Sequence, residues 1–494
     1  MAINIFLSII SGLLIGLSFH SSNFSFLAWF SLVPFLYAIE KSRVSSRGMV
    51  CAFIFSLCYY GVALCWITQV SNLGFIILLF YLSLFYLLFY LGFRYFFSKP
   101  FKVFTLSAGW VISEFLKERV WTGFCWANLG YSQYDNFYLN QVADLFGAKF
   151  ITFLIVLFNI LIWEMIVYFR QAKRKEKRKV IFAKVIFVFL IFSTCFIYSL
   201  YRISSLEESD YLEVAVVQPN VPQELKWDES VSSDIIDKLY ILGKRTKGDV
   251  LTIFPESAWP HIVDEGSFYK LQSFIDDIQR NVLIGIISKK GVNFYNSALL
   301  LNKQAELQGY YNKIKLVPFG EYVPLRKYLN FVDIVNYIGD LSKGNDFSKL
   351  SYDSKNFSVL ICFEDIFPLH VVRMAKGCDF LINITNDAWF GGEPQASQHL
   401  GIMTLRAIEN RISIVRSANT GISGWTSFRG RIHKLNRDGK DLFFADVGRF
   451  NLSLHRERSF YNRYPQAFIA LCAIFLLAVF SANQIFAKRK AHSA

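Results

Sequence analysis

The sequence predicts an α-helical membrane bundle joined to one large α/β domain. Only 18% of the 494 residues are charged and 53% are hydrophobic, whereas soluble domains average about 25% charged residues. The apolar residues are concentrated in long runs near the two ends of the chain. Between these runs, short apolar segments rich in β-forming residues alternate with patterns of helical periodicity.

About eight membrane helices are expected from the apolar runs. Several runs reach the ~20 residues that a bilayer demands, while the first, second and fifth are short. The N-terminus has neither a basic n-region nor an obvious cleavage site, so we expect an anchor rather than a removable signal peptide. The expected spans are 3–19, 24–39, 48–70, 74–97, 101–116, 150–169, 180–201 and 466–487.

The basic residues predict the orientation of these helices. The run RQAKRKEKRK at 170–179 follows the sixth span, and KSRVSSR, RYFFSKPFK and KRK follow the second, fourth and eighth. All four fall on one side of the membrane, which favours a cytoplasmic location for both termini over a nucleic-acid-binding patch. We therefore expect an N-terminal bundle (1–202), an extracytoplasmic domain (203–465) and a C-terminal helix with a basic cytoplasmic tail (466–494).

The extracytoplasmic segment predicts an α/β sandwich or layered sheet. Its strand-like runs are YLEVAVVQPN, DVLTIFPES, NVLIGIISK, SALLLN, FSVLICFE, DFLINITND and RISIVRSAN. Its helical patterns are SSDIIDKLYILGKR, GSFYKLQSFIDDIQR and QASQHLGIMTLRAIENR.

Of the eight cysteines, only Cys362 and Cys378 fall in this segment. An oxidising compartment can pair two such cysteines, but we expect Cys378 to be buried and unpaired. The chain has no CxxC or HxxxH spacing of the kind that holds zinc, so neither a metal nor a cofactor is expected.

Three strand ends carry groups whose chemistry is complementary. Glu256 follows an apolar strand and a proline, Lys313 and Glu321 flank a Pro- and Gly-containing loop, and Cys362 ends another strand. Ligands collect at the carboxyl ends of strands in open α/β sheets. A carboxylate there can take the thiol proton, and a lysine can stabilise negative charge on sulfur or on an oxyanion. Taken singly, each group also fits a structural role, as a buried cysteine, a turn residue or a surface lysine.

Longer motifs give these residues a family resemblance. FPES, YNKIKLVPFGEYVP and CFE, in this order, resemble the nitrilase superfamily, and more narrowly the bacterial apolipoprotein N-acyltransferases. VVQPNVPQELKW, NDAWFGGEPQASQHL, RAIENR, RSANTGIS and the membrane motif TGFCWANLGYSQ extend the similarity over essentially the whole chain. The resemblance implies an αββα sandwich for the extracytoplasmic domain.

The resemblance implies a Glu–Lys–Cys triad. Cys362 would be the nucleophile that carries an acyl chain as a thioester, and Glu256 the general base and later the acid. Lys313 would stabilise the thiolate and the oxyanion, helped by the backbone N–H of Phe363. Lys315 matches a variable position and receives no catalytic role.

Further residues receive supporting roles by the same resemblance. Glu321 would position the catalytic groups. Glu364 would support the site, even though it places a carboxylate two residues after the Cys362 nucleophile. Trp227, Trp389 and Phe390 resemble aromatic residues on mobile arms around the family's active site, although core packing is an equal alternative for the last two.

The implied reaction is a two-step transfer in the bacterial inner membrane, with the catalytic domain on the periplasmic side. A phospholipid, typically phosphatidylethanolamine, would give an acyl chain to Cys362. The α-amino group of the diacylglyceryl-cysteine of an apolipoprotein would then accept it. The expected partners are these two lipid substrates and the surrounding membrane lipids, with no nucleic acid, and the protein is expected to be a monomer.

Three departures from the family pattern stand in this sequence. Phe363 replaces a usual Tyr, Cys125 replaces a usual Pro in TGFCW, and GWTSFRGRI lacks an Asp before its Gly-Arg. The first removes a hydroxyl beside the nucleophile and puts donor preference in doubt.

Three other functions stay open on the sequence. A membrane-anchored carbon–nitrogen hydrolase would use the same triad on an amide, and a non-catalytic membrane scaffold would not use it at all. A transporter would need charged groups inside the bundle, where Glu114 and Glu164 are the main candidates.

Overall fold

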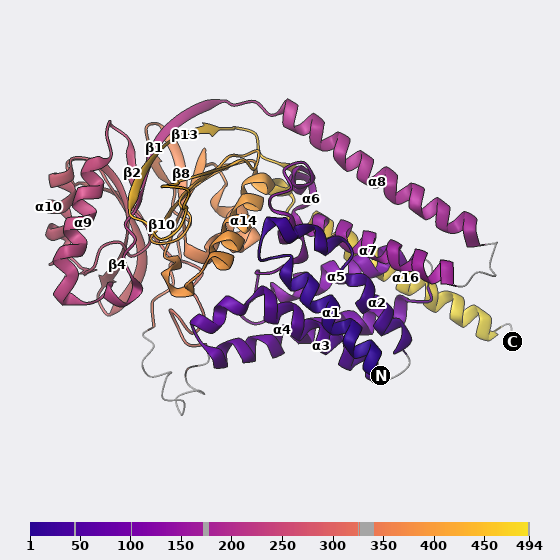
Figure 1. Cartoon of the computed structure of the whole chain (residues 1–494). Coiled ribbons are helices and arrows are strands. Elements are labelled where there is room, and N and C mark those ends of the chain that lie inside the picture. The colour runs from indigo at the N-terminus through magenta and orange to yellow at the C-terminus, as the bar shows by residue number, and fades with distance from the viewer. Residues whose placement is uncertain (44–45, 100, 171–176, 325, 327–339, 493–494) are drawn as a thin grey trace. The chain divides into compact units, whose positions relative to one another are not determined.

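The computed structural model describes residues 1–43, 46–99, 101–170, 177–324, 326 and 340–492 (Figure 1). Parts of the basic segments discussed above (44–45, 100 and 171–176) lie outside the described residues. The chain forms two compact units: Met1–Ser205 with Ser459–Ala494, and Leu206–Arg458.

The first unit is helical, and a helix lies at each position where a membrane span is expected. Among the described residues, five segments are long and apolar enough to cross a membrane by length and composition: Ser22–Lys41, Asn72–Phe96, Ala148–Arg170, Lys179–Ser205 and Ala467–Ile485. The longer helices are α1 (Ala2–Leu17), α2 (Leu32–Lys41), α3 (Arg47–Ala63), α4 (Asn72–Phe96), α5 (Lys102–Lys117), α7 (Ala148–Arg170), α8 (Lys177–Ser205) and α16 (Ala467–His492). Shorter elements are η1 (Ser22–Trp29), η2 (Cys65–Gln69), η3 (Leu129–Gln133), η4 (Leu139–Val142), α6 (Ala143–Phe146) and α15 (Phe460–Arg463).

The second and third spans are built differently from the prediction. The second is longer than expected because the 3-10 helix η1 precedes α2 and extends the apolar segment to 20 residues. The third is shorter, because α3 ends at Ala63 after 17 residues and a separate 3-10 turn, η2, follows.

The charged groups within this helical unit are engaged in structural contacts. Glu164 pairs with Lys102 (3.0 Å) and Lys184 (2.7 Å). Glu114 accepts hydrogen bonds from the backbone N–H of Leu129 (2.8 Å) and the Thr152 hydroxyl (3.0 Å). Both carboxylates therefore join helices or fix a loop, as expected for charges in an apolar bundle and unlike a polar transport pathway.

The second unit contains two β-sheets. One has the order β13-β1-β2-β4-β5-β6, with β3 beside β4, and the other has the order β12-β11-β10-β9-β8-β7. The strands of the first sheet are β1 (Asp210–Gln218), β2 (Leu251–Ile253), β3 (Ile262–Val263), β4 (Asn281–Lys290), β5 (Asn293–Leu301), β6 (Leu307–Asn312) and β13 (Asp446–Leu454). Those of the second are β7 (Leu350–Tyr352), β8 (Lys355–Ile361), β9 (Phe380–Thr385), β10 (Ser413–Ala418), β11 (Gly424–Thr426) and β12 (Ile432–Lys434).

Helices cover the outer face of each sheet, which gives the expected αββα sandwich (Figure 1). Helices α9 (Ser232–Arg245) and α10 (Phe268–Ile278) cover the first sheet, and α13 (Pro368–Met374) and α14 (Glu393–Asn410) cover the second. Side chains alternate along each strand: Val282 and Ile284 of β4 pack with α9 and α10, while Leu283 joins the core shared by the two sheets. Burial of both faces explains why β4 and β9 read as nearly continuous apolar runs.

Candidate active site

Glu256 lies in the turn that follows β2, and a glycine makes room for this turn. A Cβ on Gly285 of β4 would stand 2.5 Å from the carbonyl oxygen of Pro255 and 2.6 Å from Cα of Glu256. Both neighbours are backbone atoms that cannot move aside without moving the turn. The close approach of β4 therefore determines where the Glu256 side chain begins.

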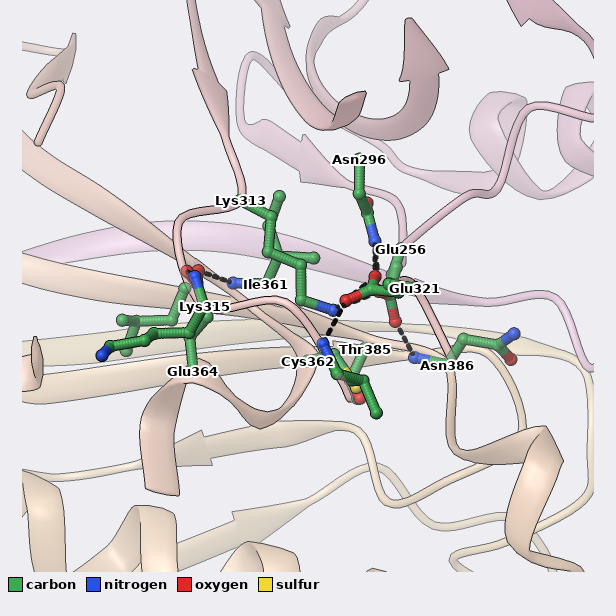
Figure 2. Close-up of polar contacts among 12 residues, drawn as sticks. Glu256, Asn296, Lys313, Lys315, Glu321, Ile361, Cys362, Glu364, Thr385 and Asn386 are labelled. Carbon is green, nitrogen blue, oxygen red and sulfur yellow. Dashed lines mark hydrogen bonds and ion pairs between the residues drawn. The ribbon is translucent and has the colours of Figure 1, made fainter. Parts of the chain in front are cut away.

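Lys313 follows β6 and lies between two carboxylates (Figure 2). Its Nζ is 3.2 Å from Oε1 of Glu256 and 2.8 Å from Oε1 of Glu321. Although burial opposes a charge here, these carboxylates hold the pKa of Lys313 above its ordinary value. The site therefore contains a lysine that stays protonated.

Asn296 of β5 joins the same two carboxylates. Its Nδ2 donates to Oε1 of Glu256 (2.7 Å) and to Oε1 of Glu321 (2.9 Å). The other oxygen of Glu256 accepts from the backbone N–H of Asn386 (2.9 Å), and that of Glu321 from the backbone N–H of Val317 (2.8 Å). Each carboxylate is thus held at both oxygens.

Cys362 directly follows β8 and opens the 3-10 turn η7 (Cys362–Ile366) with a φ of 55°. A non-glycine residue in this left-handed region is uncommon and occurs where the surrounding structure imposes it. Burial and the nearby Glu256 raise the pKa of the thiol well above its ordinary value, and Lys313 only partly offsets them. The resting thiol is therefore protonated, and a base is needed to activate it.

Glu364, two residues after the cysteine, points away from the Cys362 sulfur (Figure 2). Glu364 accepts hydrogen bonds at 2.8 Å from the backbone N–H groups of Ile314, Lys315 and Ile361. Burial raises the pKa of the Glu364 carboxyl to about 7, although these N–H donors lower it. Glu364 thus ties the loop of Lys313 to the strand of Cys362.

Phe363 and Lys226 complete the surroundings of the triad. The Lys313 ammonium lies 5.4 Å from the centre of the Phe363 ring, within the range of a cation–π contact. Lys226 is 3% exposed, although its sequence neighbourhood favours exposure, and its Nζ donates to the carbonyl oxygen of Glu256 (3.0 Å). Burial lowers the pKa of Lys226 to about 8.

Of the three aromatic residues assigned to substrate contact, Trp227 lies in a turn, and Trp389 and Phe390 lie in the 3-10 helix η8 (Asp387–Phe390). Trp227 is 46% exposed and Trp389 is 54% exposed, so neither is a core residue. Phe390 is half-buried beside Trp389.

Sequence reasoning missed Asn296, Lys226 and Thr385. Asn296 had a detectable signal, since it lies on the same face of β5 as the buried Ala298 and Leu300, where an amide needs a partner. Thr385, at the end of β9, lies beside Cys362 (Figure 2). Lys226 gave no signal, because it stands in the charged segment ELKWDE, which is typical of an exposed loop.

The described residues contain no group of three or more His, Cys, Asp or Glu side chains arranged to hold a metal ion. Cys378 is buried and free, with its sulfur 3.3 Å from the Ser358 hydroxyl.

The geometry provides a protonated lysine, a carboxylate and a buried thiol at the carboxyl ends of strands from both sheets. A carboxylate that removes the thiol proton, beside a cation that stabilises the product anion, is the arrangement required for nucleophilic acyl transfer.

Comparison with known proteins gives the same chemistry a family context. Residues 11–161 match the apolipoprotein N-acyltransferase N-terminal domain, and residues 213–449 match the carbon-nitrogen hydrolase domain. The apolipoprotein N-acyltransferase of Geobacter metallireducens is 32% identical, covering 94% of this chain and 92% of that protein. The apolipoprotein N-acyltransferase of Haemophilus ducreyi is 29% identical, covering 85% of this chain and 85% of that protein. That of Thermotoga maritima is 28% identical, covering 97% of this chain and 93% of that protein.

Solved structures match about half of this chain at low sequence identity. An amidase from Nesterenkonia sp. is 16% identical with a TM-score of 0.39, covering 50% of this chain and 93% of that chain. The match to the Geobacter protein, by contrast, spans the helical unit and the sandwich alike. The chain therefore belongs to the apolipoprotein N-acyltransferase family, within the nitrilase superfamily.

Proposed function

We propose that this protein moves an acyl chain from a phospholipid to the α-amino group of the N-terminal diacylglyceryl-cysteine of apolipoproteins, through a thioester on Cys362. The observation that carries the proposal is the buried contact of Lys313 with Glu256 and Glu321 next to the thiol. The proposed substrates, a phospholipid and an apolipoprotein, are inferred from membership of the acyltransferase family.

In the first step, Glu256 takes the proton of the Cys362 thiol, and the thiolate attacks the sn-1 ester carbonyl of the donor. The negative charge passes from sulfur to the carbonyl oxygen, where Lys313 and the backbone N–H of Phe363 stabilise it. The C–O bond then breaks, and Glu256 returns the proton to the departing lysophospholipid. The enzyme is left with the acyl chain as a thioester.

In the second step, the free amino group of the diacylated apolipoprotein attacks the thioester. Glu256 takes a proton from the attacking nitrogen, the C–S bond breaks, and Cys362 leaves as a thiolate that recovers its proton. One carboxylate thus serves as base and acid in both steps. Phosphatidylethanolamine is the proposed donor, and Trp227, Trp389 and Phe390 are the proposed contacts for the lipid chains.

The same proposal places the protein in the inner membrane as a monomer with eight spans, both termini cytoplasmic and residues 203–465 periplasmic. Contacts inside the helical unit support a common side for the basic loops. Asn4 donates to Ser42 (2.8 Å), and the Arg43 guanidinium lies 4.1 Å from the Phe97 ring centre. The first, second and fourth spans therefore share one end of the bundle.

A membrane anchor suits this reaction better than amide hydrolysis. Both substrates are confined to the bilayer, so anchoring the site there replaces a three-dimensional search with proximity. An enzyme that hydrolyses a soluble amide would gain nothing from membrane helices. The sequence match to the Geobacter protein extends over these helices as well as the sandwich.

Intact-protein mass spectrometry tests the proposal directly. After incubation with phosphatidylethanolamine, the protein should gain the mass of one acyl chain, hydroxylamine should remove it, and Cys362→Ala should gain none. Absence of the adduct in folded protein with a reduced Cys362 would refute the acyltransferase assignment and favour a hydrolase.

A further inference from the structure

A buried polar cluster lies behind the nucleophile and takes no part in the mechanism above. It consists of Asp365 in η7, Asp387 after β9, His399 on α14 and Arg416 on β10. Each of the four is at most 5% exposed. Burying four polar or charged side chains costs free energy unless each of them is hydrogen-bonded or ion-paired.

Arg416 connects the cluster through both of its terminal nitrogens. One nitrogen lies 2.9 Å from the amide oxygen of Asn383 and 3.4 Å from Asp365, and the other lies 2.9 Å from Asp387 and 2.7 Å from Nδ1 of His399. Nδ1 of His399 also lies 3.3 Å from Asp387, and its Nε2 lies 2.8 Å from Asp365, so the imidazole joins the two carboxylates.

The cluster reaches Cys362 through two residues on one face of β9. Asn383 donates from Nδ2 to the backbone oxygen of Cys362 (2.9 Å) and accepts from Arg416. Thr385, two residues further on, donates its hydroxyl to Asp387 (3.2 Å). Thr385 also lies beside Cys362, because the two residues directly follow the paired Ile361 and Ile384 of the adjacent strands β8 and β9 (Figure 2).

A threonine hydroxyl carries one proton, so it can serve Asp387 or an anionic sulfur but not both. Asp387 does not depend on it, because Arg416 and the side-chain amide of Gln395 (3.2 Å) also donate to this carboxylate. A thiolate, by contrast, gains from every donor in a dry site.

We propose that the Thr385 hydroxyl turns from Asp387 to the Cys362 sulfur when the thiol loses its proton, and that the Asp365–Asp387–His399–Arg416 cluster holds Thr385 in place. The thiol proton goes to Glu256, and Thr385 keeps its own. The hydroxyl thereby contacts the reacting atom, whereas the four cluster residues are positioning residues. The inference rests on the proposed role of Cys362 as nucleophile and adds a second donor to the sulfur besides Lys313.

Alkylation of Cys362 by iodoacetamide measures this stabilisation without any lipid substrate. The full-length protein and Thr385→Val are compared by site-resolved mass spectrometry from neutral to alkaline pH. The charged groups that face the sulfur, namely Glu256, Lys313, Lys226 and Asp387, are the same in both proteins. Loss of a hydrogen bond raises the pKa of the thiol, and the greater nucleophilicity of the resulting thiolate offsets only about half of this effect, so alkylation of Thr385→Val should be slower by roughly 4- to 15-fold at a pH near 8.

Two variants control for packing. Thr385→Ser keeps the hydroxyl and should react at the wild-type rate, as should Thr404→Val, which deletes a buried hydroxyl that donates to the Leu400 carbonyl (2.9 Å). Wild-type reactivity in Thr385→Val, or equal slowing in Thr385→Ser, would overturn the proposal. If thermal unfolding shows that Thr385→Val does not fold, Thr385→Ala carries the same expectation.

If the proposed acyltransferase function is wrong, the wild-type protein forms no acyl adduct with phospholipid. The difference in alkylation rate between Thr385→Val and Thr385→Ser is still observed in that case, so the two failures can be told apart.

Discussion

At the scale of single residues, the site is held together by hydrogen bonds between side chains distant in the sequence. Asn296 illustrates this, because it lies 40 residues from Glu256 and 25 from Glu321 yet contacts both carboxylates. The donor reduces the repulsion between two carboxylates that share Lys313. Correct placement of the base in this site therefore depends on a neutral amide.

Asn296→Ala should slow formation of the acyl-enzyme. It removes a donor from two buried carboxylates, and a hydrogen bond to a charged group is worth about 1.5–3 kcal/mol, which corresponds to roughly 10- to 100-fold in rate. Single-turnover acylation followed by intact mass measures it. Asn302→Ala is the matched control, because Asn302 also donates to a glutamate, Glu306, but in an exposed turn. Equal rates for the two variants would show that Asn296 does not position Glu256.

At the scale of elements, the strands that the sequence predicted are those with continuous apolar runs. β1, β4, β8, β9 and β10 belong to this group because the sandwich buries both of their faces. Strands β3, β6, β7, β11, β12 and β13 were missed, because β3, β7, β11 and β12 have three residues or fewer and β6 and β13 bury only a minority of their residues.

The residues of the site likewise divide into those that the sequence predicted and those that it did not. Glu256, Lys313, Glu321 and Cys362 were recognised because each stands in a motif with turn residues around it. The partners Asn296 and Thr385 lie inside strands, and only the tertiary structure brings them to the carboxylates and the sulfur. Sequence motifs and the family resemblance therefore predicted the groups that are proposed to react, while the residues that contact them required the pairing of strands.

Glu364 links the end of β6 to the end of β8, and its raised pKa predicts that the protein becomes less stable as pH rises. Its pKa of about 7 in the folded protein exceeds the ~4.3 of an unfolded glutamate, so the folded state binds more protons between these values. Stability from this group is therefore fully present below the unfolded pKa and is lost as pH rises through about 7. His370, 3.4 Å away, does not titrate in this window because burial lowers its pKa to about 3.

Glu364→Gln isolates this effect. The variant loses hydrogen bonds at every pH, but the difference in unfolding temperature between wild type and variant should widen as pH falls from about 8 to about 5. Differential scanning fluorimetry at matched ionic strength measures it. A difference that stays constant or narrows toward acid would contradict a raised pKa at Glu364.

At the scale of the whole molecule, the two units answer different requirements of one reaction. The sandwich supplies a buried thiol with a base and a cation, a set that also suits soluble hydrolases of the superfamily. The helices confine that set to the bilayer, where both lipid substrates reside. The proposed function thus needs the sandwich on the side of the membrane where the apolipoprotein N-terminus lies.

This requirement predicts which positions an impermeant reagent can reach. In spheroplasts, a membrane-impermeant maleimide should label Gln304→Cys, in the exposed turn after β5, but should label Ser46→Cys, in the exposed turn before α3, only after permeabilisation. The reason is the concentration of Lys and Arg in the loops on the side of Ser46, which the positive-inside rule places in the cytoplasm. Labelling of the wild-type cysteines gives the baseline for both variants. The reverse pattern would invert the proposed topology and place the thiol in the cytoplasm, away from exported apolipoproteins.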